Sequence, residues 1–229
     1  NDNYYYQPAT GELKTLPGII DAIPIQLAGR FLAFLPGDHD QMLISAADQL
    51  WLYQPSSARM LKIFQAANYQ PGLNRYADKF SLDPQGVLWF TFRGIGLLGF
   101  DSKTMSLRYH FDTENKLLSN QVFANQLDDL GHLWFAGNYG LSRLDTQSLR
   151  IEHFSKKDGL ASNTFSYGAS AKLSNGELAF ATNLGITLFD PAKLMEVPAP
   201  PEVVITSIHA LNEQVSHSLG DVTGQSFTF

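Results

Sequence analysis

The stretch from Leu127 to Asp145, LDDLGHLWFAGNYGLSRLD, decides the fold. It contains a turn-like Asp-Asp-Leu-Gly, a Trp-Phe pair, a Gly-Asn-Tyr-Gly segment and an apolar run that ends in Asp. Such a block could be a catalytic loop or one copy of a structural module, and the two interpretations predict different functions. Internal repeats distinguish them, because a packing unit recurs along a chain whereas a catalytic loop usually occurs once.

The block does recur. Residues 131–145 align without a gap with residues 176–190, at an offset of 45 residues, and with residues 86–101 after one extra loop residue. A fainter copy covers residues 40–54, where Leu43 takes the position that Trp89 and Trp134 hold in the later copies. Four copies indicate a packing unit rather than a catalytic loop.

Each copy is predicted to form four short strands. In the third copy they are 121–127, 132–137, 141–145 and 149–155, joined by turns rich in Asp and Gly, which tolerate positive φ. The second strand is apolar on both faces, which suits a sheet packed between two neighbours. The fourth strand alternates, as in Leu107, Tyr109 and Phe111, and suits a half-exposed outer edge. A four-stranded unit of about 40 to 50 residues, stacked on its own copies, is typical of a β-propeller blade.

The repeats set the predicted domain boundaries. An N-terminal half blade covers 1–17, and blades cover 31–64, 76–111, 120–154 and 163–190. A Pro-rich linker, 191–201, precedes the strand of a further domain, 202–229. The chain begins without a start methionine or a leader, so we expect it to be a piece of a longer protein.

Composition excludes several kinds of chemistry. The formal net charge is −6 and there is no basic run, so nucleic acid and anionic membrane surfaces are poor partners. Without cysteine there is no thiol catalysis, zinc-thiolate site or disulfide. The six histidines have no metal-ligand spacing, and no Gly-rich phosphate loop precedes a helix. We therefore predict no metal and no cofactor.

In a propeller, small ligands usually meet the face formed by the loops between strands two and three and by the links between blades. Polar and aromatic residues in these segments that differ from copy to copy are the better candidates, because they offer directed hydrogen bonds and a stacking face for a sugar-like ligand. The predicted ligand-binding residues are Arg75, Tyr76, Arg93, Asn138, Tyr139, Tyr167 and Asn183. Asn74, Asn120 and Asn163 recur once per blade, which favours a turn or cap role. Trp89 and Trp134 are predicted to be blade core.

These residues resemble a known family. The segments LDPQGVLWFTFRGIGLLGFD, LDDLGHLWFAGNYGLSRLD and DGLASN resemble regulator-propeller repeats, and PPEVVITSIHALNEQV resembles the start of the Ig-like tyrosine-rich module that follows them. Such propellers are the sensor regions of hybrid two-component histidine kinases and membrane diguanylate cyclases. The resemblance implies an all-β fold, in which about four four-stranded blades of a larger propeller precede the start of an Ig-like β-sandwich. No kinase or cyclase motif is present.

The resemblance implies a non-catalytic, periplasmic sensor of an unknown small molecule, for which we consider an oligosaccharide, with no direct membrane contact in this segment. One alternative is an enzyme, because residues 86–101 also resemble repeats of streptogramin-lyase propellers. Those repeats often carry Glu after Trp-Phe-Thr, where this chain has Phe92 and, in the third copy, Gly137. Sialidases need a clustered arginine triad, and the arginines here are scattered. The other alternative is a structural scaffold, in which open blade edges pair two molecules as a homodimer.

Overall fold

The structure, a computed structural model, describes residues 4–7, 12–15, 29–35, 38–46, 48–66, 77–195, 209–210 and 213–214. The chain divides into two compact units, Asn1–Lys193 and Leu194–Phe229. Within the described ranges the regular structure is β-strand, with short 3-10 turns at η1 (Pro55–Ser57), η3 (Lys156–Asp158) and η4 (Lys193–Met195). The predicted all-β class is therefore confirmed.

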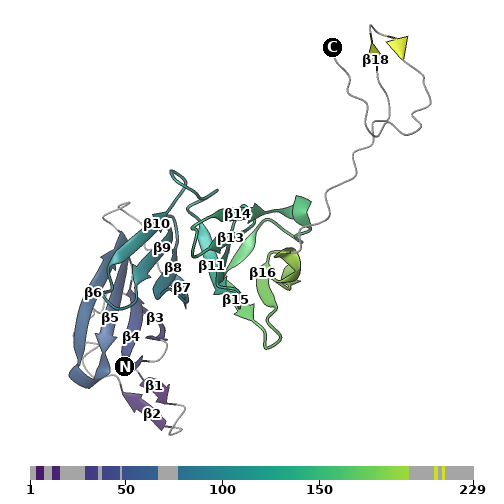
Figure 1. The fold of residues 1–229 in the computed structure, drawn as a ribbon. Helices are drawn as coiled ribbons and strands as arrows, with labels where there is room; N and C mark the ends of the chain where they lie inside the picture. The colour runs from purple at the N-terminus through teal and green to yellow at the C-terminus, as the bar shows by residue number, and fades with distance from the viewer. Residues whose placement is uncertain are drawn as a thin grey trace. The chain divides into compact units, whose positions relative to one another are not determined.

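The first unit is a series of antiparallel sheets in which strands that follow one another in the sequence lie side by side (Figure 1). A two-stranded hairpin comes first, formed by β1 (Tyr4–Gln7) and β2 (Glu12–Thr15). The first four-stranded sheet consists of β3 (Gly29–Leu35), β4 (Asp38–Ala46), β5 (Gln49–Gln54) and β6 (Arg59–Gln65).

Three further sheets repeat this pattern. The second sheet consists of β7 (Ala77–Leu82), β8 (Val87–Phe92), β9 (Gly96–Asp101) and β10 (Leu107–Phe111). The third consists of β11 (Val122–Leu127), β12 (His132–Gly137), β13 (Leu141–Asp145) and β14 (Ile151–Phe154). The fourth, within the described residues, consists of β15 (Phe165–Lys172), β16 (Leu178–Thr182) and β17 (Gly185–Phe189).

The core lies between successive sheets, because their second strands are apolar on both faces. On β12, Leu133 and Phe135 join a cluster with Val87 and Leu97 of the second sheet. The alternate residues, Trp134 and Ala136, join Leu178 and Phe180 of the fourth sheet. A similar cluster fills the junction of the first and second sheets. This face-to-face stacking of short antiparallel sheets is the packing of propeller blades.

The hairpin turns before Trp89 and before Trp134 are each held by one carboxylate. Asp128 is 4% exposed; its Oδ1 accepts hydrogen bonds from the backbone N–H groups of Leu130 and His132, at 2.9 and 2.8 Å, and its Oδ2 accepts the indole N–H of Trp134 at 2.8 Å. Asp83 binds the indole of Trp89 in the same way. These aspartates are thus turn and core groups.

The second unit is described only at β18 (His209–Ala210) and β19 (Glu213–Gln214), which pair antiparallel. The rest of the predicted linker beyond residue 195, and of the Ig-like segment, lies outside the described residues. The Ig-like assignment therefore stays a prediction.

Candidate functional site

The first strands of the second, third and fourth sheets lie side by side, since β11 contacts both β7 and β15. Each of the three is interrupted near its start. On β7, residues 78–79 lie opposite Thr91 alone; on β11, Phe123 has no partner between the pairs Val122–Gly137 and Ala124–Ala136; and on β15, residues 166–169 lie opposite Ala181 alone. Bulges of this kind re-aim side chains and occur next to functional sites.

Tyr167, a bulge residue of the fourth sheet, contacts an arginine of the second sheet and a bulge residue of the third. The guanidinium carbon of Arg93, which directly follows β8, lies 3.8 Å from the ring centroid of Tyr167 on β15. The ring of Phe123 on β11 lies 4.1 Å from that of Tyr167, tilted by 51°. Tyr167 is 53% exposed although it makes both contacts. We call Arg93, Phe123 and Tyr167 the Arg-aromatic cluster; it joins residues from three consecutive sheets.

The loops between strands two and three are tied to the links between sheets. The N–H of Gly94 donates to the carbonyl of Asn120 at 2.8 Å, and the N–H of Gly140 donates to that of Asn163 at 2.8 Å. Position 140 requires glycine, because its φ is +116° and a Cβ there would lie 2.2 Å from the carbonyl oxygen of Phe154. Loops and links therefore form one surface, as expected for this face of a propeller.

The link asparagines cap the preceding turns. The side-chain oxygen of Asn120 accepts the N–H of Thr113 at 2.8 Å, and that of Asn163 accepts the N–H of Lys156 at 2.8 Å. The cap role predicted from their recurrence is confirmed for these two positions. Asn74 lies outside the described residues.

Asn138 and Tyr139 border a small pocket. Its volume is about 20 Å³, and its other walls include Leu117, Gln121 and Val122. A cavity of this size holds one or two water molecules, far below the roughly 300 Å³ of a drug-sized ligand site. Tyr139 is 63% exposed beside it. The pocket and the Arg-aromatic cluster share the link that runs from Leu117 to Phe123.

The structure brings together only some of the predicted residues. Arg93 and Tyr167 are in direct contact. Asn138 and Tyr139 border the small pocket beside the link that leads into β11. The side chain of Asn183 accepts a hydrogen bond from Ser162 at 2.6 Å, which fixes its own loop to the preceding link. Arg75 and Tyr76 lie outside the described residues.

A polar network across the first strands of the second, third and fourth sheets was missed from the sequence. The amine of Lys79 donates to Oε1 of Gln126 at 2.7 Å and to the carbonyl and hydroxyl of Ser170 at 2.9 and 3.1 Å. Asn125 is fully buried. Its side-chain oxygen accepts a hydrogen bond from the hydroxyl of Ser81 at 2.7 Å, and its side-chain nitrogen donates one to the carbonyl of Lys79 at 3.1 Å. Burial lowers the pKa of Lys79. The network links the first strands of three sheets, and its one sequence signal is a lysine where the later copies have Ala124 and Ala169.

The histidines on the outer strands are anchored by neighbouring groups. A ring nitrogen of His110 lies 2.9 Å from the carbonyl of Ile95, and one of His153 lies 2.8 Å from the hydroxyl of Ser142. Within the ranges that the structure describes, no three His, Asp or Glu side chains are grouped so that they could hold a metal ion.

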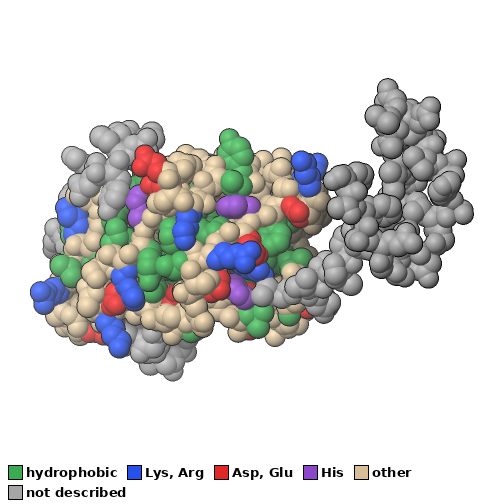
Figure 2. All heavy atoms as spheres, turned by 45° about the horizontal axis from the view of Figure 1, so that its top comes forward, with side chains coloured by type: hydrophobic (Ala, Val, Ile, Leu, Met, Phe, Trp, Pro, Cys, Tyr) green, Lys and Arg blue, Asp and Glu red, His purple; other side chains and the backbone are tan. Residues whose placement is uncertain are grey.

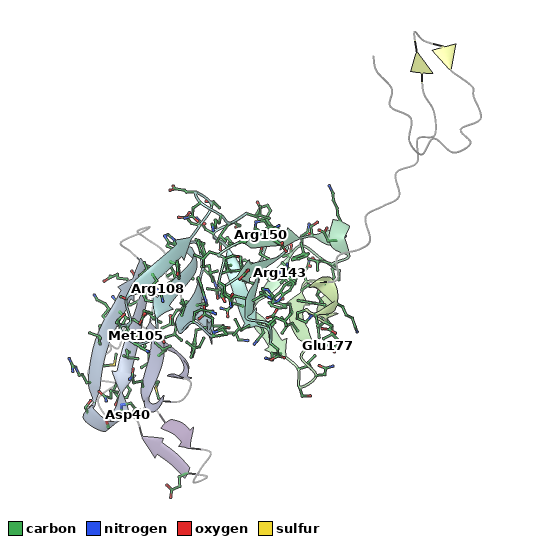
Figure 3. All side chains as sticks on the ribbon, viewed as in Figure 1. Asp40, Met105, Arg108, Arg143, Arg150 and Glu177 are labelled. Carbon is green, nitrogen blue, oxygen red and sulfur yellow. The ribbon has the colours of Figure 1, made fainter. Side chains whose placement is uncertain are left out.

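Charged side chains on and next to the third and fourth strands form ion pairs. Glu152 binds both Arg143 and Arg150, and Arg108 lies 3.7 Å from Asp101. Figure 3 labels the three arginines of these pairs, Arg108, Arg143 and Arg150. On the face shown in Figure 2, basic and acidic side chains are interspersed. No helix in the described part of the chain is long and apolar enough to cross a membrane.

The comparison by sequence finds a signalling protein. No protein-family model matches the chain. Histidine kinase P4 of Formosa agariphila is 27% identical over 101 residues, which are 44% of this chain and 7% of that protein. The chain therefore spans a small fraction of its relative.

The comparison by structure finds a β-propeller among its matches, the WD40 propeller domain of Doa1, with a TM-score of 0.52 and 10% identity, over 71% of this chain and 50% of that one. The extracellular domain of a putative hybrid two-component system from B. thetaiotaomicron matches with a TM-score of 0.63 and 20% identity, over 86% of this chain and 25% of that one. The extracellular domain of a putative one-component system from the same organism matches with a TM-score of 0.61 and 17% identity, over 82% and 24%. A luciferin-regenerating enzyme matches with a TM-score of 0.55 and 14% identity, over 82% and 65%.

At these identities the structural matches establish the fold, and the sequence match points to the same class of protein. The resemblance to the sensor propellers of two-component systems, predicted from the repeats, is thereby confirmed. The chain is a β-propeller segment that resembles the extracellular domains of two-component signalling proteins.

Proposed function

We propose that this chain is a ligand-sensing propeller segment, itself non-catalytic, of a membrane-bound two-component sensor or diguanylate cyclase, and that it lies on the periplasmic side of the membrane. The observation that carries the proposal is the Arg-aromatic cluster. Three different sheets contribute to it, and two of its residues stand at bulges of adjacent first strands. The bulges of β11 and β15 interrupt an otherwise regular repeat, and the contact between Phe123 and Tyr167 brings them together. Irregularities of this kind on a regular scaffold favour a binding role at that place.

The chemistry of the cluster suits a polar ligand with flat apolar faces, such as an oligosaccharide. Tyr167, which is 53% exposed, carries an aromatic ring and a hydroxyl that can donate and accept hydrogen bonds. Asn138 and Tyr139 border the link that leads into β11, and Tyr139, which is 63% exposed, offers a second aromatic ring. Because the pocket holds only one or two waters, the ligand would lie over the loops rather than inside an enclosed cavity.

A lyase function is less well supported by the residues at the matching positions. Phe92 takes the place of the glutamate that streptogramin-lyase repeats often carry, and its side chain is fully buried. At Gly137, a side chain would collide with the carbonyl of Gln121, because a Cβ would lie 2.1 Å from that oxygen. Neither position offers a carboxylate to a metal or a substrate.

A thermal-shift screen of the longest soluble form of the protein against an oligosaccharide panel tests the proposal. A ligand that binds only the folded state adds about 2.7 kcal/mol to the free energy of unfolding at a hundred times its Kd, and it thereby raises the melting temperature. We expect a saturable shift that Arg93→Ala and Tyr139→Ala reduce and that Leu130→Ala leaves unchanged. Leu130 is similarly exposed, at 55%, but lies in a hairpin turn away from these loops.

A shift retained in both Arg93→Ala and Tyr139→Ala would place the ligand elsewhere. The absence of any shift across the panel would argue against an oligosaccharide ligand. Such a result would favour the alternative of a structural scaffold, in which open blade edges pair two molecules.

A further inference from the structure

Lys79 lies in one of the three strand bulges and binds the end of another. It is part of the bulge of β7. Its amine donates to the carbonyl and to the hydroxyl of Ser170, at 2.9 and 3.1 Å. Ser170 is the residue at which the regular pairing of β15 with β16 resumes after the bulge at residues 166–169. A side chain of the second sheet therefore binds the end of the bulge that contains Tyr167.

The third sheet binds Ser170 as well. The hydroxyl of Ser170 donates to the carbonyl of Asn125 at 2.7 Å. The remaining hydrogen bond of the Lys79 amine goes to Oε1 of Gln126, at 2.7 Å. An ammonium group has three N–H donors, and these three acceptors match that number. The donors of Lys79 are therefore directed at Ser170 and Gln126 rather than at a ligand.

The backbone between Tyr167 and Ser170 does not follow strand geometry. Residues 166–169 lie opposite Ala181 alone, and Gly168 has a φ of +62°. In a regular strand, pairing fixes the face on which each side chain lies, and a shift by one residue moves it to the other face. The bulge lacks this constraint, so the direction of Tyr167 depends on the point where the strand is next anchored, which is Ser170.

The lysine departs from the repeat at this position. The third and fourth copies have Ala124 and Ala169 there, and Ala124 is fully buried in the core. Burial lowers the pKa of Lys79, because a less hydrated site disfavours the charged amine. Alanine carries no such cost of desolvation. A lysine in the second copy, where the next two copies have alanine, favours a role that is specific to this place.

We propose that Lys79 is a positioning residue of the candidate binding site. By anchoring Ser170, it holds the bulge of β15 in the conformation in which Tyr167 contacts both Arg93 and Phe123. Its effect on ligand affinity rests on the function proposed above, whereas its effect on the Arg-aromatic cluster does not.

Hydroxyl-radical footprinting, read by mass spectrometry of the peptides, tests this geometry without a ligand. Phe123 is the reporter, because its side chain is 2% exposed and its ring lies 4.1 Å from that of Tyr167. Tyr167→Ala should uncover Phe123 and so calibrates the signal. In the longest soluble form of the protein, we expect Lys79→Met to raise the oxidation rate of Phe123 at least about threefold. Lys79→Arg, which keeps charged N–H donors, should restore most of the protection.

Lys172→Met is the matched control. Lys172 is the last residue of β15 and also binds the third sheet, through Asp129, but it lies beyond the bulge. Its loss should leave the oxidation rate of Phe123 unchanged. If Lys79→Met does not fold, Ser170→Ala takes its place, because it removes the hydroxyl that accepts from the amine and should also raise the rate at Phe123.

Three outcomes would overturn the proposal. One is an unchanged Phe123 rate in Lys79→Met beside a raised rate in Tyr167→Ala. Another is no rise in Tyr167→Ala, because the ring of Tyr167 would then not cover Phe123. The third is an equal rise in Lys172→Met, or a rise in the peptides that contain Trp89 and Trp134, since Lys79 would then act only on overall stability.

The oligosaccharide screen separates this inference from the proposed function. Lys79→Met should reduce a ligand-induced thermal shift, as Arg93→Ala does, although its amine is directed at other protein groups. A shift retained in full by Lys79→Met would overturn its effect on affinity. A raised Phe123 rate in a protein that no member of the panel stabilises would support the positioning role and would count against oligosaccharide sensing alone.

Discussion

The bond between Asp128 and Trp134 allows a quantitative test of the blade core. Trp134 is fully buried; its ring lies 4.8 Å from that of Phe189 and 5.4 Å from that of Phe154, and its N–H donates to Asp128 at 2.8 Å. Trp134→Ala removes these contacts and leaves a cavity between the third and fourth sheets. We expect a loss of about 3 to 5 kcal/mol in the free energy of unfolding.

The partner residue makes the test more specific. Asp128→Ala leaves a buried indole N–H and two turn N–H groups without their acceptor, at a cost of about 1 to 3 kcal/mol. The double variant should cost less than the sum of the two single variants, by about 0.5 to 3 kcal/mol, because the hydrogen bond can be lost only once. The fourth repeat has already lost both groups, since it carries Leu173 and Ala179.

Urea unfolding followed by far-UV circular dichroism would measure these free energies from the midpoint and slope. Leu130→Ala is the control, because that side chain is 55% exposed and should change stability by less than about 0.5 kcal/mol. Two outcomes would contradict the reasoning. One is a Trp134→Ala midpoint equal to that of wild type, and the other is strict additivity of the two substitutions.

Three further predictions concern backbone, cap and pH. Gly140→Ala should destabilise the protein more than Gly185→Ala in the same urea assay, because both have positive φ but only Gly140 faces a carbonyl oxygen, 2.2 Å from a Cβ. Asn163→Ala should cost about 1 kcal/mol through loss of its bond to the N–H of Lys156, and Asn163→Asp, which keeps the acceptor, should cost less. Burial lowers the pKa of His153, despite a hydrogen bond to the backbone of Lys116. Below about pH 6.5 the unfolded chain therefore binds more protons at this histidine than the folded chain does, and the free energy of unfolding should decrease as the pH falls. His153→Gln should flatten this dependence in melts between about pH 7.5 and 5.5, and an unchanged slope would contradict the assignment.

The sequence by itself determined the fold class and the repeating unit. Apolar second strands, Asp-Gly turns and the 45-residue offset are local features, and local features set strand pairing in short antiparallel hairpins. Asn120 and Asn163 were assigned correctly for the same reason, since a cap bonds to groups only a few residues away in the chain. Recurrence also separated the structural tryptophans from the candidate ligand residues.

The tertiary structure alone decided which residues meet. Arg93, Phe123 and Tyr167 come from three repeats, and their contact depends on bulges whose positions follow from register rather than from residue type. Lys79 reaches Ser170 two repeats later only because the first strands lie side by side. The exposure of Ile186 is likewise not a property of its repeat, because Leu97 and Leu141 are buried at the equivalent positions. Contacts between repeats depend on how the sheets stack, and the pattern within one repeat does not say which side chains of neighbouring repeats meet.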